Sequence, residues 1–131
     1  PRAMIEAPGE QVCWIDCDCE IRSDISDVFQ LTGTADFGLT QDWCNRRYEW
    51  ATGLVCVNSK QHLYKWAEIC EHREYRGDQE VFDVIKNFYR IKELPREYQW
   101  LRLEGDNPEC KVMHWTGQKG KEHIRNAIKS R

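Results

Sequence analysis

The sequence has no surplus of positive charge and no long hydrophobic run. Its 131 residues include 19 lysines and arginines against 22 aspartates and glutamates, which gives a formal net charge of −3. Nucleic-acid binding normally needs a basic surface that neutralises phosphates, so this balance argues against it. The apolar runs span only a few residues, far short of the ~20 that cross a bilayer. We therefore expect no membrane span.

Targeting signals and metal-binding cysteine spacings are also lacking. Charged residues interrupt the first ten positions, which argues against a signal peptide. Seven cysteines are an odd number, and we expect reduced thiols in a cytoplasmic protein. Cys13, Cys17 and Cys19 could be taken for a zinc or redox cluster. However, C-x3-C-x-C is not a zinc-knuckle spacing, so buried free thiols are the better interpretation.

The remaining composition is that of an ordinary globular domain. Hydrophobic residues make up 40% and charged residues 31% of the chain, and the mean hydropathy is −0.77. The length fits a single domain over residues 1–131. Strand-like and amphipathic helical segments alternate, which predicts an α/β or α+β fold with a mixed sheet flanked by helices. Strands are expected at 11–16, 34–39, 50–57, 98–103 and 111–115, and helices at 23–29, 58–70, 78–89 and around 124–128.

One short apolar segment ends in two aspartates. The run from Val12 to Ile15 is followed by Asp16 and Asp18, and residues two apart point to the same face of a strand. Adjacent carboxylates at the end of a buried strand repel each other, and a divalent cation would relieve that repulsion. Alternatively, one aspartate caps the next segment and the other is simply solvated.

A histidine and a loop rich in glycine and lysine follow the last expected strand. Backbone N–H groups of such a loop can cradle an anion, here with Gly117, Lys119 and Lys121. The imidazole of His114 suits a borderline divalent ion. Alternatively, His114 is a hydrogen-bonded residue at a strand end and the lysines are solvated. Together, however, the two stretches suit one ligand, a metal-bound diphosphate.

These stretches resemble the GT-A family of nucleotide-sugar-dependent glycosyltransferases. Asp16-Cys17-Asp18 is similar to the D-x-D motif that ends a hydrophobic strand in that family. His114-Trp115-Thr116-Gly117 is similar to the first half of the H-x-x-G-x-x-K motif of branches that include the glycogenin-like one. The seventh position of that motif is Gly120 in this chain, with Lys119 and Lys121 on either side.

Two further stretches resemble landmarks of the same family. Residues 50–55 are similar to the strand in which a glycine lies beneath the acceptor sugar, which implies acceptor binding by Thr52 and Gly53. Gly77-Asp78-Gln79-Glu80 looks like the acidic motif that opens a helix beside the donor sugar. The resemblance implies catalytic roles for Asp78 and Gln79, although Asp78 is equally explained as a helix N-cap.

The resemblance also implies a ligand set and a cofactor. Asp18 would be the main metal ligand, Asp16 would contact the metal or the ribose, and His114 would complete the set. The ion would be Mn²⁺ or Mg²⁺, acting as a Lewis acid on the diphosphate leaving group. The substrates would be a nucleotide-diphosphate sugar and an acceptor that the sequence does not identify.

The family fold has a Rossmann-like nucleotide-binding half before the D-x-D strand, and this sequence begins near that strand. We therefore expect the C-terminal half of such a fold, with its exposed sheet edge covered in a homodimer or by a partner chain. A non-catalytic descendant that binds a sugar, a nucleotide or a protein is an alternative function. A metallohydrolase or nuclease built on Asp16, Asp18 and His114 is less favoured, because a basic surface is lacking.

Overall fold

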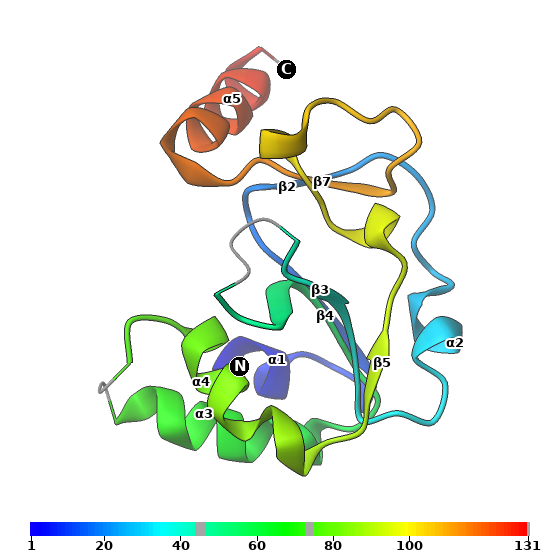
Figure 1. The fold of residues 1–131 in the computed structure, drawn as a ribbon, viewed down its shortest axis with the longest axis vertical. Helices are drawn as coiled ribbons and strands as arrows, with labels where there is room; N and C mark the ends of the chain where they lie inside the picture. Colours follow the sequence, from blue (N-terminus) through cyan, green and yellow to red (C-terminus); the bar gives the residue numbers. More distant parts are fainter. Residues whose placement is uncertain (44–46, 73–74, 131) are drawn as a thin grey trace.

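The computed structural model describes residues 1–43, 47–72 and 75–130, and it contains two mixed β-sheets flanked by helices (Figure 1). The strands are β1 (Val12–Ile15), β2 (Cys19–Ile21), β3 (Phe37–Gln41), β4 (Trp50–Val57), β5 (Ile91–Glu93), β6 (Trp100–Leu101) and β7 (Val112–His114). The α-helices are α1 (Arg2–Glu6), α2 (Val28–Thr32), α3 (Leu63–Glu71), α4 (Asp78–Ile85) and α5 (Gly117–Lys129). Single 3-10 turns lie at Lys60–His62, Lys86–Phe88, Arg96–Tyr98 and Arg102–Glu104. The predicted fold class is confirmed, with two sheets where the sequence suggested one.

The larger sheet has the strand order β1-β4-β3-β5, and the smaller one has the order β2-β7-β6. In the larger sheet, β4 pairs antiparallel with β1 and β3, and β5 joins β3 in parallel. In the smaller sheet, β7 pairs antiparallel with β2 and parallel with β6. Consecutive strands β1 and β2 therefore belong to different sheets, and the short link between them passes from one sheet to the other.

Strand β4 has apolar side chains on both faces. Val55 and Val57 pack with residues of α3 and α4, whereas Leu54 and Cys56 pack in a second cluster with a residue of α2. This follows from the two-residue alternation of a strand, and it explains why the strand reads as a nearly continuous apolar run. Each fully buried aliphatic side chain stabilises the fold by roughly 1.5–3 kcal/mol. The neighbouring strands therefore pair with β4, and the neighbouring helices pack against its two faces.

Helix α5 lies at the opposite end of the molecule from α3 and α4 (Figure 1). Gly120 is its one buried residue, and Ile128 on its expected apolar face is 69% exposed. Nowhere in the described ranges does a helix combine the length and apolar character needed to cross a membrane.

Strand β1 differs from the buried strand predicted at 11–16. It lies at the edge of the larger sheet, and the side chain of Trp14 is 37% exposed. Val12 is its one buried residue. An apolar run therefore does not establish that a strand is buried when its neighbours are unknown.

Three other predicted segments have different bounds in the structure. The helix predicted at 23–29 begins at Val28, because the Asp24 carboxylate accepts a hydrogen bond from the Ser26 N–H (2.8 Å) and forms a turn instead. The strand predicted at 34–39 is β3, which begins at Phe37 and extends to Gln41. Of the strand predicted at 98–103, β6 forms only Trp100–Leu101, between two 3-10 turns.

Candidate functional site

The D-x-D segment is the link between the two sheets. The Asp16 N–H donates to the Gly53 carbonyl of β4 (2.9 Å), and the Cys19 N–H donates to the Asp16 carbonyl (3.0 Å). Strand β2 then pairs with β7, with Cys19 opposite His114. The Trp115 N–H donates to the Asp18 carbonyl (2.8 Å). Backbone pairing therefore brings the two aspartates beside a histidine almost 100 positions away in the chain.

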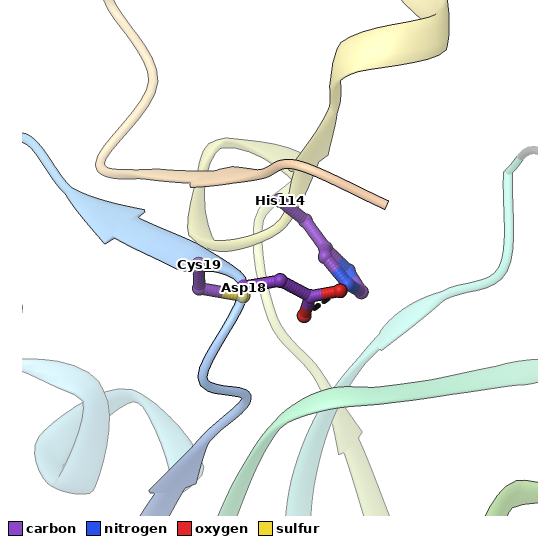
Figure 2. A group of neighbouring side chains, drawn as sticks. All are labelled: Asp18, Cys19 and His114. Carbon is purple, nitrogen blue, oxygen red and sulfur yellow. Dashed lines mark ion pairs between the residues drawn. The ribbon is translucent and has the colours of Figure 1, made fainter. Parts of the chain in front are cut away.

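Asp18 and His114 meet at the centre of this region. The Asp18 carboxylate reaches towards the His114 ring (Figure 2), with Oδ1 3.2 Å from Nε2. Their side chains are only 13% and 12% exposed. A carboxylate oxygen and an imidazole nitrogen are thus held together with little access to water. This is the geometry that a metal site or a buried ion pair requires.

Cys19 is the third member of this cluster in the structure. One ligand atom from each of Asp18, Cys19 and His114 lies within 4.8 Å of the other two, the one such group of three that the described residues form. Burial, and to a lesser degree the Asp16 and Asp18 carboxylates, raises the pKa of the Cys19 thiol well above its ordinary value. The thiol is therefore protonated at neutral pH. A protonated sulfur is a poor ligand for the oxygen-preferring ions Mn²⁺ and Mg²⁺.

Asp16 lies outside this cluster but lines the same cavity as His114. Its Oδ1 accepts a 2.7 Å hydrogen bond from the Trp14 indole N–H. Burial raises the pKa of Asp16, and the Asp78 and Asp18 carboxylates add to the effect, while Trp14 and His114 oppose it. The ionised carboxylate is thus incompletely compensated by the protein. A bound cation would supply the missing compensation.

We expect Asp16→Asn to be more stable than the parent protein at neutral pH. A carboxyl group whose pKa is raised by folding stabilises the folded state less as pH rises through that pKa. The difference in the free energy of unfolding between Asp16→Asn and the parent should become smaller towards pH 4. At that pH the Asp16 carboxyl of the parent is increasingly protonated in both the folded and the unfolded chain. Asparagine retains the oxygen that accepts the Trp14 bond. Urea unfolding at pH 7 and pH 4 measures this difference.

Asp106→Asn is the matched control for this measurement. The Arg22 guanidinium, 2.6 Å from Asp106 Oδ1, lowers the pKa of Asp106. Removing the Asp106 charge should therefore destabilise the protein at neutral pH. Opposite signs for the two variants are expected. Equal stability of Asp16→Asn and the parent at pH 7 would contradict a poorly compensated charge on the half-buried Asp16.

Half of the site residues predicted from sequence line one cavity of about 110 Å³. Asp16, Thr52, Gly53, Gln79 and His114 all lie on its wall. Asp18 is joined to it through its contact with His114. The structure thus brings together residues from four separate parts of the sequence, and their oxygen and nitrogen atoms suit a polar ligand.

Asp42, which contacts Gln79, is a residue of this cavity that sequence reasoning missed. Gln79 Nε2 donates to Asp42 Oδ2 (3.0 Å) and to the Trp50 carbonyl (2.9 Å). Asp42 also lines the cavity, at the end of β3. The sequence interpretation placed it in a surface loop at 41–48, of which residues 44–46 lie outside the described residues. A polar residue directly after a strand was the signal that could have identified it.

Asp78 is placed next to this cavity rather than on it. It is the first residue of α4, and the N-cap is Gly77, without a side-chain capping bond. The alternative interpretation of Asp78 as the N-cap is therefore not what the structure shows. Its carboxylate acts on Asp16 electrostatically, and its backbone carbonyl accepts a bond from the Trp66 indole (2.9 Å).

The predicted glycine and lysine loop is the first turns of α5. Helix α5 begins at Gly117, after Thr116 at the N-cap, and Lys119 and Lys121 are exposed. Lys121 lines a second cavity, of about 300 Å³, together with Asp18 and Arg125. Lys119 is not among the described residues that line it. Arg125 was not predicted, although its position four residues after Lys121 places both on one helix face.

Comparison with known proteins identifies the fold. Neither protein-family models nor curated proteins match the sequence. Among the solved structures that are similar to the described fold are three glycosyltransferases. The glycosyltransferase GlyE of Streptococcus pneumoniae TIGR4 has a TM-score of 0.64 and 15% identity over 86% of this chain and 35% of its own.

The other two neighbours are also glycosyltransferases. An active-site variant of LgtC with glutamine replaced by glutamate has a TM-score of 0.62 and 13% identity, over 95% of this chain and 62% of its own. Mouse xyloside xylosyltransferase 1 has a TM-score of 0.56 and 15% identity, over 86% of this chain and 60% of its own. The chain thus spans between about a third and three fifths of these proteins, and over that length it has the fold of a glycosyltransferase.

Proposed function

We propose that this chain carries the metal and sugar-nucleotide site of a glycosyltransferase that moves a sugar from a nucleotide-diphosphate donor to an acceptor. The observation that supports it most is the convergence of Asp18 and His114, 3.2 Å apart, beside a polar cavity that also contains Asp16 and Gln79. The fold of the three neighbouring glycosyltransferases agrees with this proposal.

Mn²⁺ or Mg²⁺ is the proposed cofactor, with Asp18, Asp16 and His114 as its protein ligands. The donor set fits such an ion, because it offers carboxylate oxygens and one imidazole nitrogen and because Asp16 is a poorly compensated, half-buried carboxylate. When bound, the ion would supply Lewis-acid stabilisation of the diphosphate leaving group.

The remaining residues bind and orient the two substrates in this proposal. Lys121 and Arg125 line a cavity with Asp18, so their positive charges would hold donor phosphates there, with Lys119 and the N–H of Gly117 as further contacts. Both Nε2 hydrogens of Gln79 have protein acceptors, so its Oε1 is the atom that can accept from a sugar hydroxyl.

Three residues are assigned to the acceptor side of the reaction. Thr52 and Gly53 line the cavity and are proposed to contact the acceptor sugar. Asp78, adjacent to Gln79, is proposed to orient the acceptor hydroxyl or take up its proton.

Thermal unfolding with a panel of nucleoside diphosphates tests the proposal. We expect Mn²⁺ to raise the melting temperature, and one nucleoside diphosphate to raise it further only when Mn²⁺ is present, since ligands of the folded state stabilise it. No nucleotide effect at millimolar concentration would contradict the proposed donor. Metal binding alone would favour a metallohydrolase, and nucleotide binding without turnover of the sugar nucleotide would favour the alternative, a non-catalytic binding module.

We also propose that β1 is covered by a second copy of the chain or by a partner chain. Within the described residues β1 has only β4 as a strand neighbour, and Trp14 is 37% exposed on it. An open strand edge readily pairs with another chain. Sedimentation velocity at high concentration, without a partner, should reveal the dimer. If the protein is a monomer under these conditions, the second copy is excluded and a partner chain is the remaining candidate to cover β1.

A cytoplasmic location is the last part of the proposal. The cysteines of the described residues are all free, and Cys13 and Cys56 lie opposite each other in β1 and β4 without a bond. Free thiols are typical of a reducing compartment. Native protein with a Cys13–Cys56 disulfide would contradict this location.

A further inference from the structure

Gln99 is a buried amide behind His114 that no role in the proposed reaction accounts for. It follows the 3-10 turn at Arg96–Tyr98 and is 5% exposed. Its Oε1 accepts hydrogen bonds from the backbone N–H of Leu54 (2.9 Å) and from the Thr40 hydroxyl (3.4 Å). Because a backbone N–H can only donate, the Leu54 bond fixes which end of the amide is oxygen.

The other end of the amide faces the histidine. Gln99 Nε2 lies 3.5 Å from His114 Nδ1. An NH₂ group can only donate, so Nδ1 faces it with its lone pair, and the proton of the neutral ring lies on Nε2. That nitrogen is 3.2 Å from Asp18 Oδ1, which accepts the proton's hydrogen bond. One chain of contacts therefore runs from β4 through Gln99 and His114 to Asp18.

Gly53 makes this arrangement possible. A Cβ at position 53 would lie 2.8 Å from His114 Nδ1 and 2.9 Å from Gln99 Nε2, closer than side-chain carbons approach such atoms. The two side chains therefore approach each other across the glycine of β4. A glycine that the sequence resemblance assigned to the acceptor sugar also has a structural role, which is to admit Gln99 and His114.

We propose that Gln99 is a positioning residue that holds His114 with its proton on Nε2 and thereby moderates the affinity of the site for a metal ion. This inference rests on the proposed metal site, but its first step does not. For Nε2 to bind a metal, the proton must move to Nδ1, where it would face the NH₂ of Gln99. Turning the amide would relieve that clash but would leave the buried Leu54 N–H without its acceptor.

The substitution Gln99→Glu should favour the form of His114 that carries its proton on Nδ1. A carboxylate of the same shape can accept from the Leu54 N–H with one oxygen and from a protonated Nδ1 with the other. The Nδ1–H···carboxylate contact is the arrangement that commonly supports a metal-ligating histidine, and partners of this kind alter metal affinity by about 10–100-fold. We expect Gln99→Glu to bind Mn²⁺ on the order of 10-fold more tightly than the parent.

Nitrogen-15 NMR of the histidine rings in metal-free protein tests the first step directly. At a pH where His114 is neutral, the parent should show a protonated Nε2 and an unprotonated Nδ1, and Gln99→Glu should show a larger share of the form with its proton on Nδ1, while Asp18 still favours the proton on Nε2. The parent spectrum is decisive by itself should the variant fail to fold. A parent with its proton on Nδ1 would overturn the proposal, whether or not the protein binds a metal.

Mn²⁺ titration of the same proteins tests the consequence for affinity. Leu103→Glu is the charge control, since it adds one negative charge at an exposed residue that lines the same cavity and has no role in the proposed reaction. A gain confined to Gln99→Glu supports the proposal, whereas an equal gain in both variants would assign the effect to charge alone. If neither variant nor the parent binds Mn²⁺, the proposed metal site fails while the assignment of the His114 proton still stands on the spectra.

Discussion

Replacing Asp18 with asparagine should weaken Mn²⁺ binding by more than about 100-fold, beyond the upper end of what loss of an outer-shell partner costs. The substitution removes the negative charge that lies 3.2 Å from His114 Nε2, and a neutral amide oxygen is a much weaker ligand for a hard cation. Isothermal titration of the metal-free protein measures the loss. The Mn²⁺-dependent increase in melting temperature should disappear with it.

The same variant should keep its fold. The Asp18 backbone carbonyl, not its side chain, accepts the bond from the Trp115 N–H, and an asparagine oxygen can still accept from His114. Asp83→Asn removes one negative charge from helix α4 at a position paired with Lys86, and it should leave Mn²⁺ affinity within about 2-fold of the parent. If Asp18→Asn still responds to Mn²⁺ like the parent, the metal is bound elsewhere.

The sequence predicted those elements whose periodicity is strong. Strand β4 has its expected bounds and helix α4 begins where it was expected, because a largely apolar segment and a 3.6-residue apolar repeat are local properties. The helix predicted at 78–89 ends at Ile85, and a 3-10 turn follows it. Strand β6 was predicted too long and α2 too early, because tertiary contacts and a side-chain turn outweighed weak local preferences there.

The candidate site was predicted unevenly, and the reason is topological. Asp16, Asp18 and His114 could be selected because each ends an apolar segment and resembles a known motif. Gln99 could not, because its partner Leu54 lies 45 positions away, on strand β4 of the larger sheet. Asp42 was not selected because the segment 41–48 was interpreted as a surface loop. Residues that support a site from behind leave no local pattern in the sequence.

Replacing Gly120 with alanine should detach helix α5 from the rest of the protein. An added Cβ would lie 1.8 Å from the Trp115 carbonyl oxygen and 2.2 Å from its carbonyl carbon, atoms of the backbone that cannot rotate away. Forced overpacking costs roughly 1–3 kcal/mol, whereas the higher helix propensity of alanine favours it by only about 1 kcal/mol. The cost of the close contact should therefore exceed the gain in helix propensity, and Gly120→Ala should be less stable than the parent.

Amide hydrogen exchange along α5 measures this effect, because a detached helix exchanges much faster than a docked one. Asn126→Ala, on the exposed face of the same helix, is the matched control and should leave exchange near that of the parent or slow it slightly. Slow exchange throughout α5 in Gly120→Ala would show that the helix tolerates the added carbon.

The variant also separates the two halves of the proposed site. Trp115 holds α5 by stacking on His123, with ring centroids 3.6 Å apart, and it donates to Glu20 of β2 (3.1 Å). Detaching the helix would move Lys121 and Arg125 away from the cavity they share with Asp18. It would leave His114 in place, since His114 pairs with Cys19 where β2 meets β7, and Asp18 directly precedes that pair. Gly120→Ala should therefore retain Mn²⁺ binding while losing the added stabilisation by a nucleoside diphosphate, because the phosphates depend on α5 and the metal does not.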